Sequence, residues 1–367
     1  MNKPKDNEET WDMGQKLGIG LFLLAFIGWS SASTEWKFSI AGKALYFALL
    51  PAFFLLLCFL DCKTWKELPN KGLFFALLAA WLAVFHFFGS SLLGYIHSPS
   101  AFTGLYAVYN NSNPASDDGH GNFIPFLVVG LFWWKRKELL ALPLQIWWGG
   151  LLILVAGMVL HVSGYALQQP RLSIVALFTG IYGLMGLAWG REWLRKSIFP
   201  FFLFVFCIPL SGQADYITFP LRLLVCQLVE VVAQWVLGID VIRMGTQLFD
   251  PLGTYQYDVA PACSGIRSLI AIFLLATIYG FITFRSPWKR LLLMASVFPL
   301  AVLGNLARML FIIMAAEIGG QKWGNYVHES SIFSLIPYLP AIVGLLVIGR
   351  LMTKWWGSDE PAAQGHS

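Results

Sequence analysis

A short polar stretch, YQYDVAPACSGIRSLI at residues 255–270, places one cysteine directly before a long apolar run. Pro261 and the small residues after it are typical of the first turn of a helix, where a proline loses no hydrogen bond. Cys263 would then lie among unpaired N–H groups at the positive end of the helix dipole, and both favour a thiolate. Arg267 follows one turn later and adds positive charge. The stretch predicts a nucleophilic cysteine, although an isolated cysteine more often only packs in a core.

Two further residues with catalytic chemistry follow in the chain. Arg308 lies inside the apolar segment VLGNLARMLFIIM, where a charge is costly and therefore suggests a function. Asn305, three residues earlier on the same helical face, is placed to hold or orient the guanidinium. A plainer explanation is that Arg308 reaches outward to water or pairs with a carboxylate such as Glu317. His328 comes next, in a polar loop GNYVHES, where a histidine is usually only a surface residue.

The composition is that of a multi-pass membrane protein. The chain is 57% hydrophobic and only 12% charged, with a mean hydropathy of +0.65, whereas a soluble domain is about half apolar and about a quarter charged. The formal net charge of +5 gives no reason to expect nucleic-acid binding, because in membrane proteins Lys and Arg mark the cytoplasmic side. The N-terminus has no clear signal-peptide cleavage site, so we expect its first apolar run to remain as a span.

The apolar runs predict an all-α polytopic fold. A span needs about 20 residues of helix, and ten segments approach that length: 17–33, 43–60, 72–96, 121–134, 145–164, 172–190, 198–212, 265–284, 291–315 and 333–353. We expect one membrane domain over 17–353, with cytoplasmic tails at 1–16 and 354–367. With the N-terminus inside, 14 Lys and Arg fall in inside loops and 6 in outside loops. This bias favours both termini in the cytoplasm and a multi-pass protein of the cytoplasmic membrane.

Residues 219–239 are long enough to span but are predicted not to do so. Gln227, Glu230 and Gln234 form a polar stripe along one helical face. A span here would also place the basic loop 285–290 outside the cell. We therefore expect an amphipathic helix that lies at the outer surface or dips into it. Glu230 is then either part of the solvated face of that helix or a substrate-binding residue.

This topology puts Cys263, Arg308 and His328 in one compartment, near one face of the membrane. A thiol, a general base and a fixed cation are the equipment of cysteine-based acyl transfer. The histidine takes the thiol proton and later donates it to the leaving amine, while the arginine stabilises a thiolate or an oxyanion. No His, Cys or carboxylate residues have metal-ligand spacing, so we expect neither a metal nor a cofactor.

Three segments, PACSGIRSL, GNLARMLF and YVHES, occur in this order on the last outer-facing parts of the chain. Together they resemble the exosortase/archaeosortase family of membrane transpeptidases. GHGNFIPFLVVGLFWWKRK also looks like that family's HG-x-x-x-P stretch followed by a basic cluster. It begins in the last four residues of a predicted loop at 97–122 that holds no Lys or Arg. The resemblance covers about residues 117–350.

The resemblance implies a role for each motif residue. Cys263 would be the nucleophile, Arg308 the thiolate or oxyanion partner, and His328 the general acid and base, while His120 matches a family position of less certain role. Exosortases recognise secreted proteins that end in a short motif, a transmembrane helix and a basic cluster, of which PEP-CTERM is the best-known type. The family implies cleavage outside the membrane and transfer to a surface acceptor, a glycan or a lipid.

Two other functions fit parts of the sequence. A transporter or a scaffold for envelope polysaccharide export would use Arg308 and Glu230 to line a path, but it leaves Cys263 without a role. Transporters also often show paired broken helices in two repeated halves, and the sequence has no such symmetry. A membrane acyltransferase acting on lipid or sugar is the third reading. Genes for secreted proteins with the tripartite tail in the source genome would favour the sortase-like enzyme.

Overall fold

The computed structural model describes residues 37, 39–61, 66–89, 100–111, 118–210, 215–258, 266–330, 333 and 338–356. The chain divides into two compact units, one made of residues 1–112 and 119–209 and the other of residues 113–118 and 210–367. The first predicted span, at 17–33, lies outside the described residues. So do the predicted N-terminal tail and the part of the C-terminal tail that follows Trp356.

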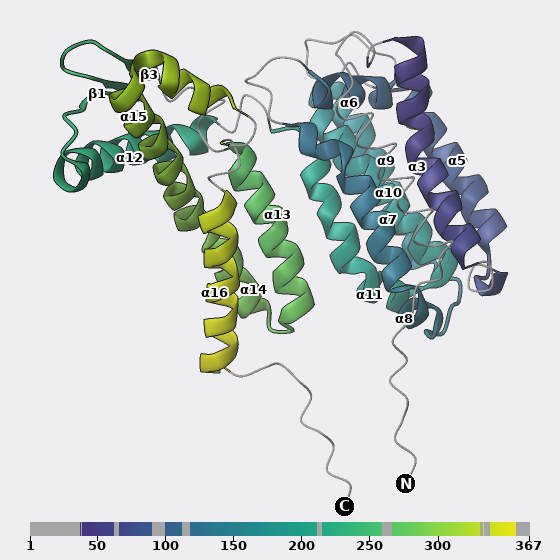
Figure 1. The fold of residues 1–367 in the computed structure, drawn as a ribbon. Coiled ribbons are helices and arrows are strands. Elements are labelled where there is room, and N and C mark those ends of the chain that lie inside the picture. Colours follow the sequence, from purple (N-terminus) through teal and green to yellow (C-terminus); the bar gives the residue numbers. More distant parts are fainter. Residues whose placement is uncertain are drawn as a thin grey trace, which may run out of the picture. The chain divides into compact units, whose positions relative to one another are not determined.

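The first unit is a group of helices that run alongside one another (Figure 1). Its elements are α3 (Ile40–Leu60), α5 (Lys71–Phe87), α6 (Ala101–Tyr109), η1 (Asp118–Asn122, at the boundary with the second unit), α7 (Ile124–Trp134), α8 (Arg136–Leu140), α9 (Gly149–Ala166), α10 (Pro170–Trp189), α11 (Arg191–Phe202) and η2 (Leu203–Cys207). The central helix is α10, which packs against α5, α9 and α11.

Small residues let α9 and α10 approach closely. A Cβ atom at Gly157 of α9 would meet the backbone nitrogen of Gly180 at 3.1 Å, and one at Gly150 would collide with the backbone of Leu187. Membrane helices use glycine at such contacts because lipid offers no hydrophobic drive for association, so close van der Waals packing must supply it. Trp81 of α5 completes the core by donating its indole N–H to the carbonyl oxygen of Leu177 at 3.0 Å.

The predicted loop at 97–122 is wrong over part of its length, because α6 lies within it. The segment AFTGLYAVY is apolar enough to bury most of its side chains, among them Leu105 and Tyr106. The Ser100 hydroxyl caps the helix by accepting from the N–H of Thr103 at 3.5 Å. The absence of Lys and Arg from this region therefore reflects a buried helix as well as a loop.

The second unit combines helices with a small antiparallel sheet. Its elements are α12 (Asp215–Val232), the π-helical turn η3 (Ala233–Leu237), β1 (Ile242–Met244), β2 (Gln247–Phe249), β3 (Gln256–Asp258), α13 (Ile266–Thr283), α14 (Pro287–Ala295), α15 (Val297–Glu329) and α16 (Tyr338–Trp356). The strand order is β1-β2-β3, with Arg243 opposite Leu248 and Leu248 opposite Tyr257. The sheet is an addition to the expected all-α fold.

Two cores hold this unit together. One joins α12 and the sheet to the middle of α15, with Val229, Leu248 and Ile312 fully buried. The other joins α13, α14 and α16 to the first turns of α15 around Ile272 and Leu345. Both cores therefore share α15, which acts as the spine of the unit.

The helix α12 lies crosswise to α13 and α16 (Figure 1). Residues Phe219–Leu237 are long and apolar enough to cross a membrane by composition alone. Their crosswise direction relative to the other long helices of the unit agrees with the predicted surface helix rather than with a parallel span.

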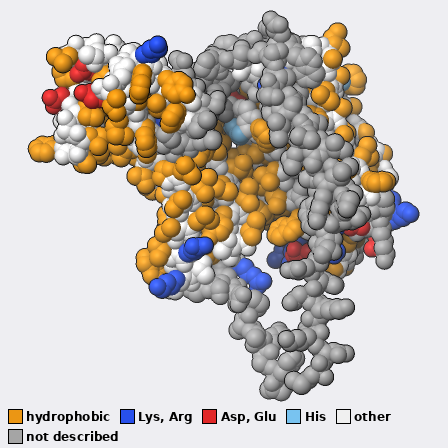
Figure 2. Space-filling view, viewed as in Figure 1, with side chains coloured by type: hydrophobic (Ala, Val, Ile, Leu, Met, Phe, Trp, Pro, Cys, Tyr) orange, Lys and Arg blue, Asp and Glu red, His pale blue; other side chains and the backbone are white. Residues whose placement is uncertain are grey.

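Six helices in the described part of the chain are long and apolar enough to span a bilayer, and two shorter apolar helices accompany them. These findings support a polytopic helical membrane protein, although the predicted count of ten spans is not confirmed. In the second unit, hydrophobic side chains cover much of the face shown in Figure 2, and Lys and Arg gather near the end of α16. That end is the one that the sequence predicts to be cytoplasmic.

Candidate active site

The helix α15 carries two of the three predicted catalytic residues on either side of a sharp bend. Gly319 has φ −129° and ψ 16°, and Gly320 has φ 68° and ψ −173°. The second conformation is one that essentially only glycine adopts. The expectation that GNYVHES, residues 324–330, forms a polar loop is wrong, because the chain stays helical up to Glu329 and only changes direction at the bend (Figure 1).

The bend brings His328 next to Arg308. The Nη2 group of Arg308 donates to the backbone carbonyl oxygen of His328 at 3.3 Å. Both residues are half-buried. The Nε of Arg308 is buried and has no hydrogen-bond partner among the described residues. The guanidinium is therefore fixed beside the histidine while one of its N–H groups remains available to a further acceptor.

The carboxylate that the sequence offered as an alternative partner for Arg308 is engaged elsewhere. Glu317 Oε2 accepts from the Tyr255 hydroxyl at 3.4 Å. Burial, followed by the negative charge of Glu317, raises the pKa of the Tyr255 phenol above its ordinary value. Tyr255 thus stays neutral, and its hydroxyl group links the residue directly before β3 to α15 by a hydrogen bond.

The strand β3 is attached to the part of α15 that follows the bend. The side-chain amide of Gln321 accepts from the Gln256 N–H at 2.8 Å and donates to the Gln256 carbonyl oxygen at 3.2 Å. Tyr257 adds a bond from its hydroxyl to the Gln321 carbonyl oxygen at 3.4 Å. Gly324 leaves the space in which the Tyr257 hydroxyl lies, since a Cβ atom there would overlap it.

Cys263 lies in the chain between β3 and α13, within residues 259–265, which are outside the described residues. The same is true of the Arg267 side chain. On the far side of this stretch, α13 packs on α15 through the core that contains Ile272 and Leu300. Both flanks of the seven undescribed residues are therefore held by the helix that carries Arg308 and His328.

The remaining predicted site residues fall in three places. Asn305 is buried one turn before Arg308, at 6% exposure, and its role in orienting the guanidinium stays a prediction. Glu230 forms an ion pair with Arg243 of β1 at 3.0 Å, so its carboxylate links α12 to the sheet. His120 is half-buried in η1 and belongs to the first unit.

A residue that the sequence counted only among the outer basic residues is buried in the second unit. Arg222 on α12 is 7% exposed, and its guanidinium lies over the ring of Phe219 at 5.5 Å. The sequence already shows Arg222 inside the otherwise apolar run FPLRLLVCQL. The cost of a charge in an apolar helix, which singled out Arg308, applies to Arg222 as well.

Membrane-length helices, one of which bends so that an arginine side chain contacts a histidine backbone, define a polytopic membrane protein with a polar site. Its family is identified by comparison with known proteins. The chain belongs to the transmembrane exosortase family, whose family model matches residues 110–336, more than half of the chain. No curated protein and no solved structure matches the chain.

Proposed function

We propose that the protein is a membrane cysteine transpeptidase that cleaves C-terminal tripartite sorting signals of secreted proteins. The observation that carries this proposal is the Arg308–His328 contact on α15, together with the attachment of both flanks of the Cys263 stretch to that helix. The family membership supports the same class of reaction. A substrate with its own transmembrane helix would meet such a site at the membrane surface.

The reaction requires two steps of acyl transfer. The Cys263 thiol gives its proton to the His328 imidazole, and its sulfur attacks the carbonyl carbon at the sorting motif. The tetrahedral intermediate collapses as the leaving amine takes the proton from His328, which leaves a thioester on Cys263. An acceptor nucleophile, or water, then attacks the thioester, His328 takes its proton, and the cysteine is released.

Arg308 supplies a fixed positive charge for this sequence. A guanidinium that is already hydrogen-bonded to the His328 carbonyl needs little reorganisation when negative charge develops on the thiolate or the oxyanion. Its Nε–H, which has no partner in the described part of the chain, adds a donor for that charge or for the substrate.

We place the protein in the cytoplasmic membrane with both termini inside and the site on the outer face. Its partners would be secreted proteins with the tripartite signal and a surface acceptor, either a glycan or a lipid. The basic residues near the end of α16 support this orientation (Figure 2).

The test is co-expression with a secreted protein from the same genome that carries the tripartite tail. Cys263→Ala and Cys263→Ser should each abolish the size-shifted product at unchanged protein level. Cys226→Ala is the matched control, because Cys226 is fully buried in the same unit and should be dispensable for cleavage. Equal processing by the Cys263 variants would exclude the thiol mechanism and leave the transporter or scaffold as the better reading.

A further inference from the structure

The first unit contains an apolar cavity of about 400 Å³ between α3, α5, α7, α10 and α11. This volume lies within the range of roughly 300–1,000 Å³ that is usual for small-molecule sites. Its walls come from mid-helix residues such as Phe54, Val129 and Ile181, and from residues at one end of the helices. A cavity with such walls suits a hydrocarbon chain rather than a polar ligand.

One end of the cavity is charged. Arg136 is the only charged residue among the described residues that line it. Its Nε donates to Asp61 at 2.7 Å, and its guanidinium lies 4.2 Å from the centre of the Trp133 ring. The helices α3, α7 and α10 end here and α5 and α11 begin here, so this end of the cavity lies at a polar boundary of the bundle.

Two neighbouring tryptophans at this end, Trp189 and Trp193, differ in the hydrogen bonding of their indole N–H groups. Trp189 donates its indole N–H to the Pro69 carbonyl oxygen at 2.9 Å. Trp193 lines the cavity and is only 6% exposed. Its Nε1 nevertheless has no hydrogen-bond partner among the described residues. Buried indole N–H groups normally find an acceptor. An acceptor on a molecule bound in the cavity would satisfy this donor after a small rotation of the Trp193 ring toward the cavity.

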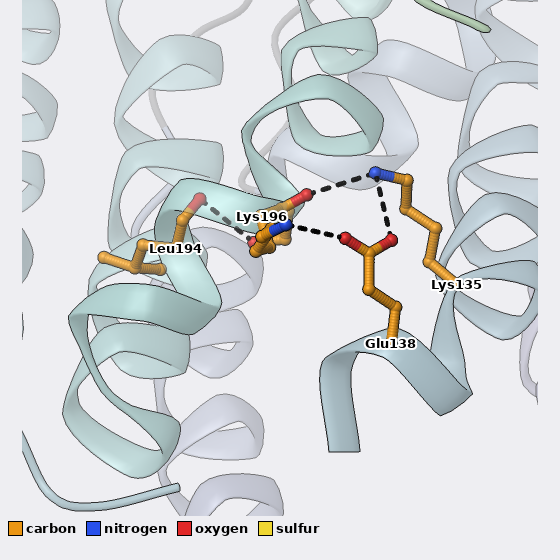
Figure 3. Close-up of polar contacts among 5 residues, drawn as sticks. Lys135, Glu138, Leu194 and Lys196 are labelled. Atoms are coloured by element: carbon orange, nitrogen blue, oxygen red, sulfur yellow. Dashed lines mark hydrogen bonds and ion pairs between the residues drawn. The ribbon is translucent and has the colours of Figure 1, made fainter. Parts of the chain in front are cut away.

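The surface around this end carries an excess of positive charge. In the described residues 61, 66–71, 135–145 and 189–197, there are eight Lys and Arg and four Asp and Glu. Lys135 and Lys196 share one carboxylate, that of Glu138, at 3.9 and 3.0 Å (Figure 3). The bond from Lys196 lowers the pKa of Glu138 below its ordinary value. Two ammonium groups with one counter-charge leave a positive position for an anion.

We propose that this cavity binds one acyl chain of an anionic glycerophospholipid. The chain fills the apolar space, an ester carbonyl oxygen accepts from the Trp193 indole N–H, and the phosphate faces the Lys135–Lys196 pair. This combination of an apolar tail, one acceptor and a negative headgroup matches the apolar walls, the indole donor and the basic residues around the charged end. The proposal concerns the first unit and is independent of the proposed cleavage reaction.

The test is native mass spectrometry of the purified full-length protein, after exchange into detergent containing phosphatidylglycerol and phosphatidylcholine of the same chain length. The wild type should retain one phosphatidylglycerol per chain in preference to phosphatidylcholine. Val129→Phe, which fills the cavity, should lower the retained fraction about tenfold. Trp193→Phe keeps an aromatic side chain but removes the N–H donor, and should lower the retained fraction about fivefold.

Two controls make the result decisive. Trp148→Phe changes an exposed tryptophan outside the cavity lining and should retain lipid as the wild type does. The Lys135→Gln, Lys196→Gln double variant should bind phosphatidylcholine and phosphatidylglycerol equally. Wild-type protein that retains no lipid, that shows no preference for phosphatidylglycerol, or that binds as much lipid after Val129→Phe or Trp193→Phe would overturn the proposal. Because Trp193→Phe keeps an aromatic side chain and introduces no overlap, it still tests the cavity if Val129→Phe fails to fold.

Discussion

Arg308 is held by the backbone, and not by the side chain, of the residue that we propose as general acid and base. This separates two effects that mutations usually confound. A substitution at His328 removes the imidazole but leaves the carbonyl that accepts from the guanidinium. A substitution at Arg308 removes the charge and the contact together.

We therefore expect His328→Gln to leave the protein folded and to lower cleavage by about 10²–10⁴-fold, the usual contribution of general acid–base catalysis. The rate of product formation in the co-expression assay, normalised to enzyme level, measures this effect. Asn325→Gln is a control on the same helical segment, where the side chain is exposed. A His328→Gln enzyme with wild-type rate would remove the imidazole from the mechanism.

For Arg308→Lys we expect a loss of about 10²–10³-fold, although the charge is kept. A lysine ammonium is a point charge that cannot reproduce the fixed fork of donors in a guanidinium. Lys322→Gln, which removes an exposed cation from the same helix, should have no effect. Full activity of Arg308→Lys would show that only the net charge at this position matters.

The residue types of the site were predictable from sequence, but their proximity was not. Arg308 stood out because charge inside an apolar helix is costly, and His328 because it follows that helix in the family's order. The predicted topology placed both residues on the same side of the membrane, but it gave no distance between them. The distance depends on the conformation of one glycine, Gly320, and a Gly-Gly pair in the sequence indicates a break without giving its direction. Arg222 was missed because it was counted only among the basic residues on the outer side.

The bend of α15 is the element that sets the site geometry. At Gly320 the added methyl of an alanine meets no atom within 4 Å, so any effect arises from the backbone conformation. We expect Gly320→Ala to destabilise the protein by about 1–3 kcal/mol and to reduce cleavage, because relaxing the bend moves His328 away from Arg308. Thermal unfolding in detergent and the cleavage assay measure the two effects.

A matched control for this substitution lies in the first unit. Gly130 of α7 also has open space around it and has ordinary helical geometry. Gly130→Ala should be neutral or slightly stabilising, since alanine favours helix over glycine by about 1 kcal/mol. If both variants behaved alike, the left-handed conformation at Gly320 would not be what holds the bend.

The long helices followed from sequence because a run of about 20 apolar residues has few other stable conformations in a membrane. The short elements did not. Each strand of the sheet has three residues, too few to show an alternating pattern, and α6 was hidden by the polar residues on either side of it. The predicted span at 198–212 begins earlier as α11, at Arg191, because a polar first turn precedes its apolar part.

At the scale of the whole molecule, the orientation of the chain depends on α12. If α12 lies on the outer surface, the turn at Gly245 between β1 and β2 is outside and the turn at Ser286 between α13 and α14 is inside. If α12 spans, both assignments reverse. We expect alkaline phosphatase fused after Gly245 to be active and GFP fused after Ser286 to fluoresce. The opposite pattern for both fusions would show that residues 219–237 cross the membrane.

The bond pattern between Gln321 and β3 also bears on how the protein behaves at high concentration. A strand at the edge of a sheet normally offers unpaired N–H and C=O groups to any other strand and so promotes aggregation. Here the Gln321 amide occupies both groups of Gln256 on the edge of β3 that faces away from β2. At Gln256 a helix side chain therefore takes the place of a neighbouring strand, and we expect it to hinder edge-to-edge pairing of the purified protein.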